Sequence, residues 1–384
     1  MSDKKIRKVL IFSLAYYPRF GGAEIALKEI TDRIPDIEFH VLTLNFGGEV
    51  REEKIGNVIV HRVGNGASYL SKILFIPRAA YAARALHVSL RFDAFWAMMS
   101  YMLFPIVFLR FVGLRVPYLL TLQEGDPWKH MFSRWFILPL RPFLSIGFRN
   151  ASAVSAISTY LGQWATHMGF NGRVAVIPNG VDLNRFINLP HPPFVVADTV
   201  NLVTASRLVH KNAIDEVIRA LVLLPKNIQF VIYGGGPDEM KLRKLSEELG
   251  VSDRVLFKGH SSHAELARAF STAHIFIRPS RSEGMGNSFI EAMAVGLPVI
   301  ATQEGGIADF LFDEKRNLGK PSTGWAVDVD SPEHIALAVK DIISNPGKVA
   351  RVRANALALV REKYDWNLIA RDMKTLFRHL FENR

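Results

Sequence analysis

The first half of the chain alternates short apolar runs with longer stretches in which apolar residues recur at helical spacing. We expect the runs to be strands, because strands buried on both faces of a sheet read as nearly continuous apolar segments. The predicted strands are Val9–Ala15, Glu38–Leu44, Val58–Arg62, Ala94–Ala97, Tyr118–Leu122, Ala153–Ala156 and Val174–Ile177. Repeated alternation of strand and helix predicts an α/β fold with a doubly wound parallel sheet.

A proline-rich segment, Leu189–Thr199, interrupts this rhythm, which then begins again. A chain of 384 residues is long enough for two cores, so we expect one Rossmann-like domain over residues 1–187 and another over 188–364. The predicted strands of the second domain are Val200–Ala205, Gln229–Tyr233, Val255–Lys258, Ile275–Ile277, Pro298–Ala301 and Gly324–Val327. Its predicted helices include Ile214–Leu224, Pro237–Leu249, Ser262–Ala269 and Phe289–Ala294.

The segment FGGAE, Phe20–Glu24, follows the first predicted strand and opens a helix. Gly21 and Gly22 permit close approach of backbone to a ligand, and the N–H groups at a helix N-terminus favour phosphate. A plain strand-to-helix turn explains the same residues, because the segment is not a complete G-x-G-x-x-G pattern.

Two further motifs follow predicted strands of the second domain. SRLVHKN, Ser206–Asn212, spaces two cations so that both reach one diphosphate, Arg207 as a bidentate fork and Lys211 as a point charge. A solvated basic loop is the alternative. YGGGP, which contains Gly235, precedes a helix expected to start at Pro237, and it either holds nucleotide or only turns the chain.

The segment EGMGNSFIE carries the most specific pattern of the sequence. Glu283 and Glu291 have seven residues between them, so that a loop carboxylate and a helical one face one pocket. An anionic leaving group at the start of this helix would be stabilised by backbone amides. The amides belong to Gly284, Met285, Gly286, Asn287 and Ser288. A capping role for Glu283 and a surface position for Glu291 are the alternative interpretation.

In combination, FGGAE, PNGVD, SRLVHKN, YGGGP, EGMGNSFIE, GLPVIAT and YDWNLIA extend over nearly the whole chain, which resembles the retaining glycosyltransferases of family 4. The resemblance implies the GT-B fold, in which two Rossmann-like domains face a central cleft. It also implies that the last helix, residues 365–384, crosses back to the N-terminal domain.

The resemblance also implies roles for individual residues. The backbone N–H of Gly22 would contact the donor phosphates, and Arg207 would neutralise the diphosphate. Glu283 would lie beside the transferred sugar and Glu291 would bind the ribose hydroxyls, while the amides of residues 285–288 cradle sugar and phosphate.

The reaction implied is a front-face displacement. The acceptor hydroxyl attacks the face from which the nucleoside diphosphate leaves, and the leaving phosphate takes the proton. Arg207, a basic neighbour and helix dipoles then stabilise the departing charge. We therefore expect no metal and no cofactor other than the donor itself.

The chain departs from the family pattern at two places. The family's usual lysine falls at Asn212, so either Lys211 reaches the diphosphate from a shifted loop or that contact is lost, and we expect Lys211 to take it over. A histidine common after the strand ending at Leu122 is replaced by Gln123, which hydrogen-bonds a sugar hydroxyl but does not titrate. Glu124 and Asp126 are candidates for acceptor recognition or base chemistry, with a polar loop capped by Asp126 as the alternative.

Composition narrows the class of protein. A net charge of +11 and a pI near 9.8 predict attraction to polyanions, but no nucleic-acid-binding module is recognisable. The absence of cysteine excludes disulfides and thiolate metal sites and fits the cytoplasm. The longest apolar stretch, Ala94–Leu109, contains a proline and is shorter than the ~20 residues of a membrane-spanning helix.

Two segments, Tyr69–Phe92 and Trp128–Arg149, mix arginine and lysine with aromatic and aliphatic residues. This composition is typical of helices that lie in a membrane interface, and a lipid-linked acceptor would explain it. Alternatively, these helices bury their apolar faces on the first sheet and leave only their basic residues in water.

We therefore expect transfer of a sugar from a UDP- or GDP-sugar to a hydroxyl of a glycan or a lipid-linked acceptor. The chain would be cytoplasmic, with peripheral contact to an anionic membrane. Two other functions remain open: a nucleotide-sugar epimerase or phosphorylase on the same fold, and a non-catalytic scaffold that binds glycan or membrane.

Overall fold

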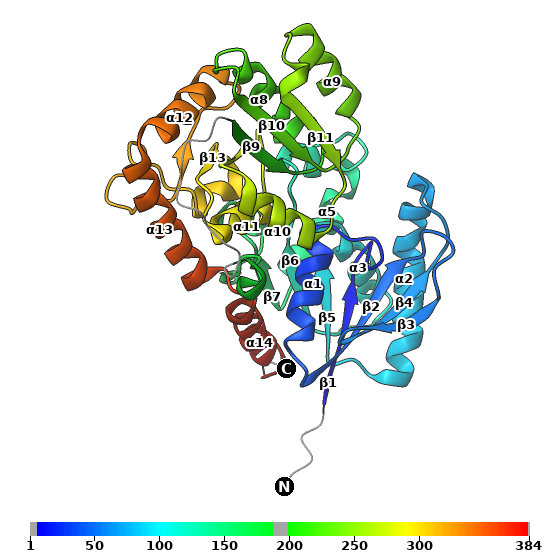
Figure 1. Ribbon diagram of the computed structural model, residues 1–384. Coiled ribbons are helices and arrows are strands. Elements are labelled where there is room, and N and C mark those ends of the chain that lie inside the picture. The colour runs from blue at the N-terminus through cyan, green and yellow to red at the C-terminus, as the bar shows by residue number, and fades with distance from the viewer. Residues whose placement is uncertain (1–5, 187–198, 383–384) are drawn as a thin grey trace. The chain divides into compact units, whose positions relative to one another are not determined.

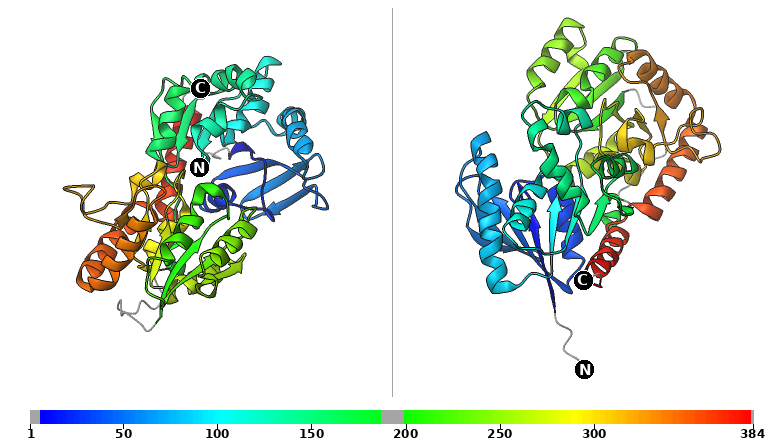
Figure 2. Two further views of the ribbon diagram at one scale, coloured as in Figure 1. Left: turned by 90° about the horizontal axis from the view of Figure 1, so that it is seen from above. Right: turned by 180° about the vertical axis from the view of Figure 1, so that it is seen from behind.

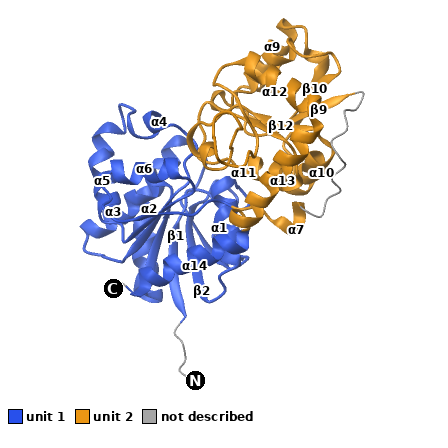
Figure 3. Cartoon of the chain, turned by 90° about the vertical axis from the view of Figure 1, so that its left-hand side faces the viewer, with its two compact units in different colours: residues 1–179, 366–384 blue, residues 180–365 orange. Residues whose placement is uncertain are grey.

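The computed structural model describes residues 6–186 and 199–382. The chain forms two compact units, which Figure 3 distinguishes by colour. Unit 1 comprises residues 1–179 and 366–384, and unit 2 comprises residues 180–365. The predicted linker and the predicted boundary at residue 187 lie outside the described residues, so that boundary stays a prediction.

Unit 1 is built on an eight-stranded sheet in the order β3-β4-β2-β1-β5-β6-β7-β8. Its strands are β1 (Arg7–Phe12), β2 (Ile37–Leu44), β3 (Glu52–Ile55), β4 (Val58–Val63), β5 (Ala94–Met98), β6 (Tyr118–Leu122), β7 (Ala153–Ala156) and β8 (Val174–Val176). Neighbouring strands are parallel except β3, which pairs antiparallel with β4. The strand order reverses direction beside β1, as a doubly wound sheet requires.

Helices cover both faces of this sheet, as Figure 1 shows. They include α1 (Gly22–Asp32), α2 (Tyr69–Leu90), α3 (Leu103–Phe111), α4 (Trp128–Phe132), α5 (Arg141–Arg149), α6 (Thr159–His167) and α14 (Trp366–Glu382). Right-handed crossovers place α2, α3 and α5 on one face and α1 on the other. The predicted return of the last helix is confirmed: α14 packs beside α1, with Phe377 against Phe39 and Trp96.

Unit 2 contains a six-stranded, wholly parallel sheet in the order β11-β10-β9-β12-β13-β14. Its strands are β9 (Val200–Ala205), β10 (Ile228–Tyr233), β11 (Val255–Gly259), β12 (Ile275–Arg278), β13 (Val299–Ala301) and β14 (Trp325–Ala326). Its helices include α8 (Ile214–Leu221), α9 (Glu239–Glu248), α10 (His263–Thr272), α11 (Asn287–Val295), α12 (Pro332–Ser344) and α13 (Pro346–Lys363). The views in Figure 2 show these helices on both sides of the sheet. The predicted pair of Rossmann-like α/β domains is thus confirmed.

The predicted elements occur with bounds shifted by up to three residues, and three differences have a clear physical reason. The edge strand β3 was not expected, because its sequence EEKI has no apolar pattern. Helix α9 begins at Glu239 rather than Pro237, since the N–H of Asp238 donates to the Leu208 carbonyl, 3.2 Å away, and holds this segment as a turn. Residues 128–149 form α4, a 3-10 turn (Leu138–Leu140) and α5 instead of one helix, with prolines at or near each start.

Within the described ranges, no helix combines the length and the apolarity that crossing a bilayer demands.

Candidate functional site

The glycine loop of unit 2 connects β12 to α11 and turns sharply at Gly286. This residue has φ = 83° and precedes the first turn of α11, to which it supplies no side-chain cap. A Cβ atom at Gly286 would lie 2.3 Å from Nη2 of Arg278 and 2.7 Å from the Phe289 ring. Only glycine fits this position, which leaves the start of an α-helix open to an anion.

Arg278, the last residue of β12, lies beneath this loop with 4% of its surface exposed. Its guanidinium donates to Oε2 of Glu283 (2.9 Å), Oγ of Ser288 (2.9 Å) and the Ala205 carbonyl (3.1 Å). It also stacks on the Phe289 ring, 4.2 Å from the centroid. Burial lowers the pKa of Arg278, and the nearby carboxylates of Glu283 and Glu291 act in the opposite direction. The buried charge is therefore paired on several sides, as a charge out of water requires.

The two predicted carboxylates are both held in place. Besides its bond with Arg278, Glu283 accepts from the Gly284 N–H through Oε1 at 3.0 Å. Glu291 is not a surface residue: it is 8% exposed on the first turns of α11, and its Oε1 lies 3.5 Å from Nδ1 of His263. Because both side chains are largely removed from water and have basic partners, neither is an ordinary helix cap.

The loop between β9 and α8 carries the two predicted phosphate-binding cations. The Arg207 side chain is exposed, while its carbonyl accepts from Nδ2 of Asn212 at 2.6 Å. The carbonyl of Lys211 accepts from the N–H of Arg281 at 2.7 Å. Asn212, which stands where the family usually has lysine, is 4% exposed and braces the loop. Asn212 thus stabilises the loop in this chain, and Lys211 is the lysine of the loop that could contact the diphosphate.

Arg281 fixes the same loop from the β12 side. Its guanidinium forms a two-bonded pair with Asp215 at 2.8 and 2.9 Å, and it also contacts Glu216 and Asp330. Such a network of charged hydrogen bonds holds a planar group in one orientation. The loop that carries Lys211 is therefore positioned before any ligand binds.

The three glycines of YGGGP bring a second loop against the first. A Cβ at Gly234 would lie 2.0 Å from the Ser206 carbonyl oxygen, and one at Gly236 would lie 2.3 Å from that of Leu208. Between them, the carbonyl of Gly235 accepts from the Leu208 N–H at 3.0 Å. Close packing against the neighbouring loop explains why Gly234 and Gly236 are glycines, and a ligand contact of Gly235 stays a prediction.

Several buried polar atoms near the ends of β9 and β12 lack a hydrogen-bond partner among the residues that the structure describes. They are Thr204 Oγ1, Ser206 Oγ, Asn212 Oδ1, Arg278 Nε and Ser280 Oγ. Buried polar groups are nearly always satisfied, so a cluster of exceptions indicates a place where water or a ligand completes the network. Parallel sheets bind ligands at this edge, beyond the carboxyl ends of the strands.

The acceptor-side candidates lie at the corresponding edge of unit 1. Gln123 accepts from Nδ2 of Asn179 at 3.1 Å, and both lie largely buried. Glu124 is 1% exposed, and its oxygens accept from the N–H groups of Ser100 (2.5 Å) and Gln123 (2.9 Å). Burial raises the pKa of Glu124. Contact of Glu124 with an acceptor is therefore not supported: the strand end needs its carboxylate to satisfy buried N–H groups. Asp126 is half-exposed.

The first glycine motif forms a helix start of its own. Gly21 precedes α1, and its N–H donates to Oε2 of Glu24 at 2.7 Å. Gly22 is the first residue of α1 and is exposed. Burial raises the pKa of the Glu24 carboxyl beside this turn. Phosphate contact through Gly22 stays a prediction.

Arg278, Arg281 and His263 were not singled out from the sequence. Arg278 ends an apolar strand and Arg281 follows it in a loop, where isolated cations are ordinary. The pairing of Arg281 is recognisable only after folding, since its partner Asp215 lies 66 positions away. Within residues 6–186 and 199–382, no group of three or more histidine, aspartate or glutamate side chains is placed to hold a metal ion.

Comparison with known proteins agrees with this architecture. Residues 20–185 match Glycosyltransferase Family 4, and residues 195–358 match Glycosyl transferases group 1. The GDP-mannose-dependent alpha-(1-6)-phosphatidylinositol monomannoside mannosyltransferase of Mycobacterium tuberculosis is 29% identical over 264 residues. That match covers 64% of this chain and 66% of the relative, slightly less than two thirds of its length.

Solved structures share the fold along nearly the whole chain. Sucrose-phosphate synthase from Thermosynechococcus elongatus has a TM-score of 0.84 at 20% identity, covering 98% of this chain and 100% of its own. Anabaena HepE in complex with UDP and glucose has a TM-score of 0.75 at 20% identity, covering 97% and 99%. The chain therefore belongs to glycosyltransferase family 4, the glycosyl transferases of group 1, and has their GT-B fold.

Proposed function

We propose that the chain is a retaining glycosyltransferase that moves a sugar from a UDP- or GDP-sugar to a hydroxyl of a glycan or lipid-linked acceptor. The observation that carries the proposal is the buried Arg278–Glu283 pair beneath the glycine loop at the start of α11. It combines a fixed carboxylate with an open helix N-terminus at the carboxyl edge of a parallel sheet.

The diphosphate of the donor would lie among the loops of unit 2. Arg207 is exposed on a loop that is braced by Asn212 and packed against the glycine triplet. Arg207 and Lys211 would neutralise the diphosphate, and the amides of residues 284–288 would accept the sugar and its phosphate. Fixed donors stabilise a departing charge without reorganising, which is the largest single contribution in many enzymes.

The two carboxylates would bind hydroxyl groups at the two ends of the donor. Glu283 is fixed by Arg278 and the Gly284 N–H, which suits a hydrogen bond to the transferred sugar. Glu291, with His263 beside it, would take the ribose hydroxyls. In a front-face displacement the acceptor oxygen bonds to the anomeric carbon as the carbon–oxygen bond to diphosphate breaks. The acceptor proton passes to the leaving phosphate.

The relatives support the substrate classes only in outline. The name of the mycobacterial relative specifies GDP-mannose and a phosphatidylinositol mannoside, and HepE was solved with UDP and glucose. We propose a lipid-linked acceptor for this chain, met at the surface of an anionic membrane. We propose no requirement for a divalent metal, because arginine, lysine and helix amides would supply the positive charge.

The test is an incubation with a panel of UDP- and GDP-sugars, with and without acceptor extract, followed by detection of free nucleoside diphosphate. The expected result is acceptor-dependent release, an α-linked product from an α-linked donor by NMR, and no loss of rate in EDTA. Release without acceptor, or an epimerised sugar, would point to the epimerase or phosphorylase alternative. The absence of any donor binding would point to a scaffold.

A further inference from the structure

All of the net charge belongs to one unit. Unit 1 contains 25 lysines and arginines and 14 aspartates and glutamates, a net charge of +11, whereas unit 2 contains 22 of each. Residues 64–181 alone contain eleven cationic and three acidic residues, a net charge of +8. Of those three, Asp93 and Glu124 are buried, and Asp93 is paired with Arg7 at 2.9 Å.

Helix α2, within this basic segment, carries apolar residues on both of its faces, and Lys72, Arg78 and Arg84 are exposed among the outer ones. The inner face packs Phe75, Ala79 and Ala83 into unit 1, where each is fully buried. The outer face presents Tyr81 at 79% exposure and Val88 at 75%, and Tyr69, Leu70, Ile73 and Leu74 are exposed on the first turns. A helix on a protein surface normally keeps large apolar side chains off its outer face, so these exposed tyrosines and aliphatic residues between cations indicate a surface that something covers.

The apolar surface continues from α2 onto the neighbouring helices. Helix α3 lies beside both α2 and α5, and the Phe111 ring meets that of Phe143 at 6.2 Å between centroids. The exposed apolar side chains of this part are Phe108, Phe111, Val112, Phe143 and Ile146. We name the outer surface of these three helices the α2–α3–α5 face.

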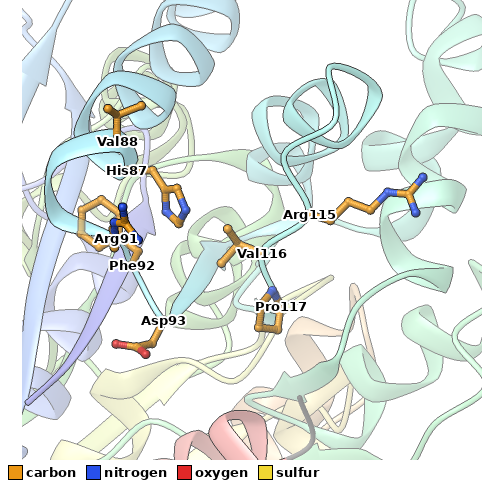
Figure 4. A pocket seen from close by; sticks show the side chains of 8 residues that line it. All are labelled: His87, Val88, Arg91, Phe92, Asp93, Arg115, Val116 and Pro117. Atoms are coloured by element: carbon orange, nitrogen blue, oxygen red, sulfur yellow. The ribbon is translucent and has the colours of Figure 1, made fainter. Parts of the chain in front are cut away.

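Arginines border two hollows on this face. The first, of about 880 Å³, lies between the end of α2 and the segment before β6, and Figure 4 shows Arg91 and Arg115 on opposite sides of it. The second, of about 250 Å³, lies between α3 and α5 and is lined by Arg110 and Arg115. None of these three arginines forms an ion pair with a carboxylate in the described part of the chain.

We propose that the α2–α3–α5 face is a membrane-docking surface, whose apolar side chains enter the headgroup region while Arg91, Arg110 and Arg115 bind lipid phosphates. The charge selects this occupant: a second copy of the chain would oppose a like-charged surface, whereas an anionic bilayer offers both complementary charge and an apolar interior. The inference deepens the proposed lipid-linked acceptor, since docking would bring the chain to the layer where that acceptor resides.

The experiment is cosedimentation of the whole chain with vesicles of equal parts phosphatidylglycerol and phosphatidylcholine, and with phosphatidylcholine vesicles alone. Wild type should bind the anionic vesicles, and raised salt should weaken the binding. Tyr81→Ser with Val88→Ser, and separately Arg91→Ser with Arg115→Ser, should each lower the partition coefficient about tenfold. A matched control removes exposed residues of unit 2, by Met240→Ser with Lys241→Ser, and should bind as wild type does.

Circular dichroism and nucleotide binding of each variant show whether it is folded and whether the donor site is intact. Wild type that stays in the supernatant with anionic vesicles would overturn the docking surface, as would equal losses in the control. A dimer in light scattering that Tyr81→Ser with Val88→Ser dissolves would show that a second copy covers the face, which also overturns it. Intact nucleotide binding in either case would leave the proposed transferase function standing.

Discussion

The two units share a Rossmann-like plan but use charge in opposite ways. Unit 2 has no net charge, and the carboxyl edge of its sheet holds two arginines in fixed ion pairs: Arg278–Glu283, which is largely buried, and Arg281–Asp215, which is partly buried. Unit 1 carries the whole net charge of +11, much of it on exposed arginines that pair with no carboxylate among the described residues, and the Glu124 carboxylate at the end of β6 is buried.

The difference teaches that charge in a fold has two distinct uses. Paired and buried, it fixes geometry at short range, because the low local dielectric penalises any displaced partner. Unpaired and exposed, it acts at long range and favours anionic surfaces, subject to screening by salt. Variants that touch only one unit separate these two uses.

Among these variants, replacing Arg207, an exposed cation of unit 2, should have the largest effect on activity. We expect Arg207→Ala to lower kcat/KM by about 10²–10³, the cost of removing one fixed donor to a departing charge, with an unchanged melting temperature. Steady-state kinetics and a thermal melt measure the two. Arg243→Ala removes another half-exposed arginine of unit 2, paired with Glu239, and should leave the rate intact. Full activity of Arg207→Ala would remove this residue from the site.

Breaking the buried pair should cost stability. We expect Arg278→Met to lower the free energy of unfolding by about 3 kcal/mol, because it leaves Glu283 without its cationic partner. Adding Glu283→Gln should recover part of the loss, although activity stays lost. Urea denaturation of the two variants and the wild type tests this. If Arg278→Met proves as stable as the wild type, the pair does not fix the loop.

The glycine loop offers a narrower test with a matched control. Gly286→Ala should destabilise the chain by roughly 1–3 kcal/mol and weaken donor binding, since a positive φ and a collision with Arg278 add together. Gly319 has a nearly identical φ of 82° but open space around its Cβ position. Gly319→Ala should therefore cost only the backbone strain. Equal losses in both variants would mean that the collision with Arg278 is unimportant.

A smaller effect distinguishes unit 1. His40 and His61 stack in its sheet with Nδ1 and Nε2 2.8 Å apart, flanked by Glu38 and Glu52. Burial and then the charge of His40 lower the pKa of His61. A lowered folded-state pKa means that the unfolded chain binds the proton first, so stability is present above about pH 6.5 and falls as the pH drops below it.

The change that tests this is His61→Gln, which keeps a hydrogen bond without titrating. Melting temperatures between pH 5 and pH 8 should decline less steeply toward low pH than those of wild type. Identical slopes for the two proteins would show that the histidine pair contributes nothing to the pH dependence.

Elements that are buried, and therefore made mostly of apolar residues, could be predicted from the sequence. Strand β5 is apolar along its whole length, the runs around β1 and β9 contain few polar residues, and α14 repeats its apolar residues at helical spacing. The polar edge strand β3 could not be predicted, because its backbone pairing with β4 leaves no trace in side-chain type. Residues 128–149 have a helical composition, but prolines divide them into α4, a 3-10 turn and α5.

The residues of the candidate site likewise include some that could be predicted from the sequence and some that could not. Glu283 and Glu291 could be singled out because they lie in one continuous segment, and their roles toward a donor stay predictions. Arg278 could not, since its partners come from β9, the glycine loop and α11. For Glu124 the sequence suggested a chemical role, because a carboxylate lies in a loop after a strand. In the structure its carboxylate accepts hydrogen bonds from two backbone N–H groups.

The most direct test of the central claim is calorimetric titration of the chain with GDP and with UDP in the absence of added metal. If the edge of unit 2 is a pyrophosphate cradle, one of these nucleotides should bind at one site per chain, and Arg207→Ala should abolish that binding while Arg243→Ala keeps it. Failure of both nucleotides to bind, or undiminished affinity in Arg207→Ala, would contradict the account.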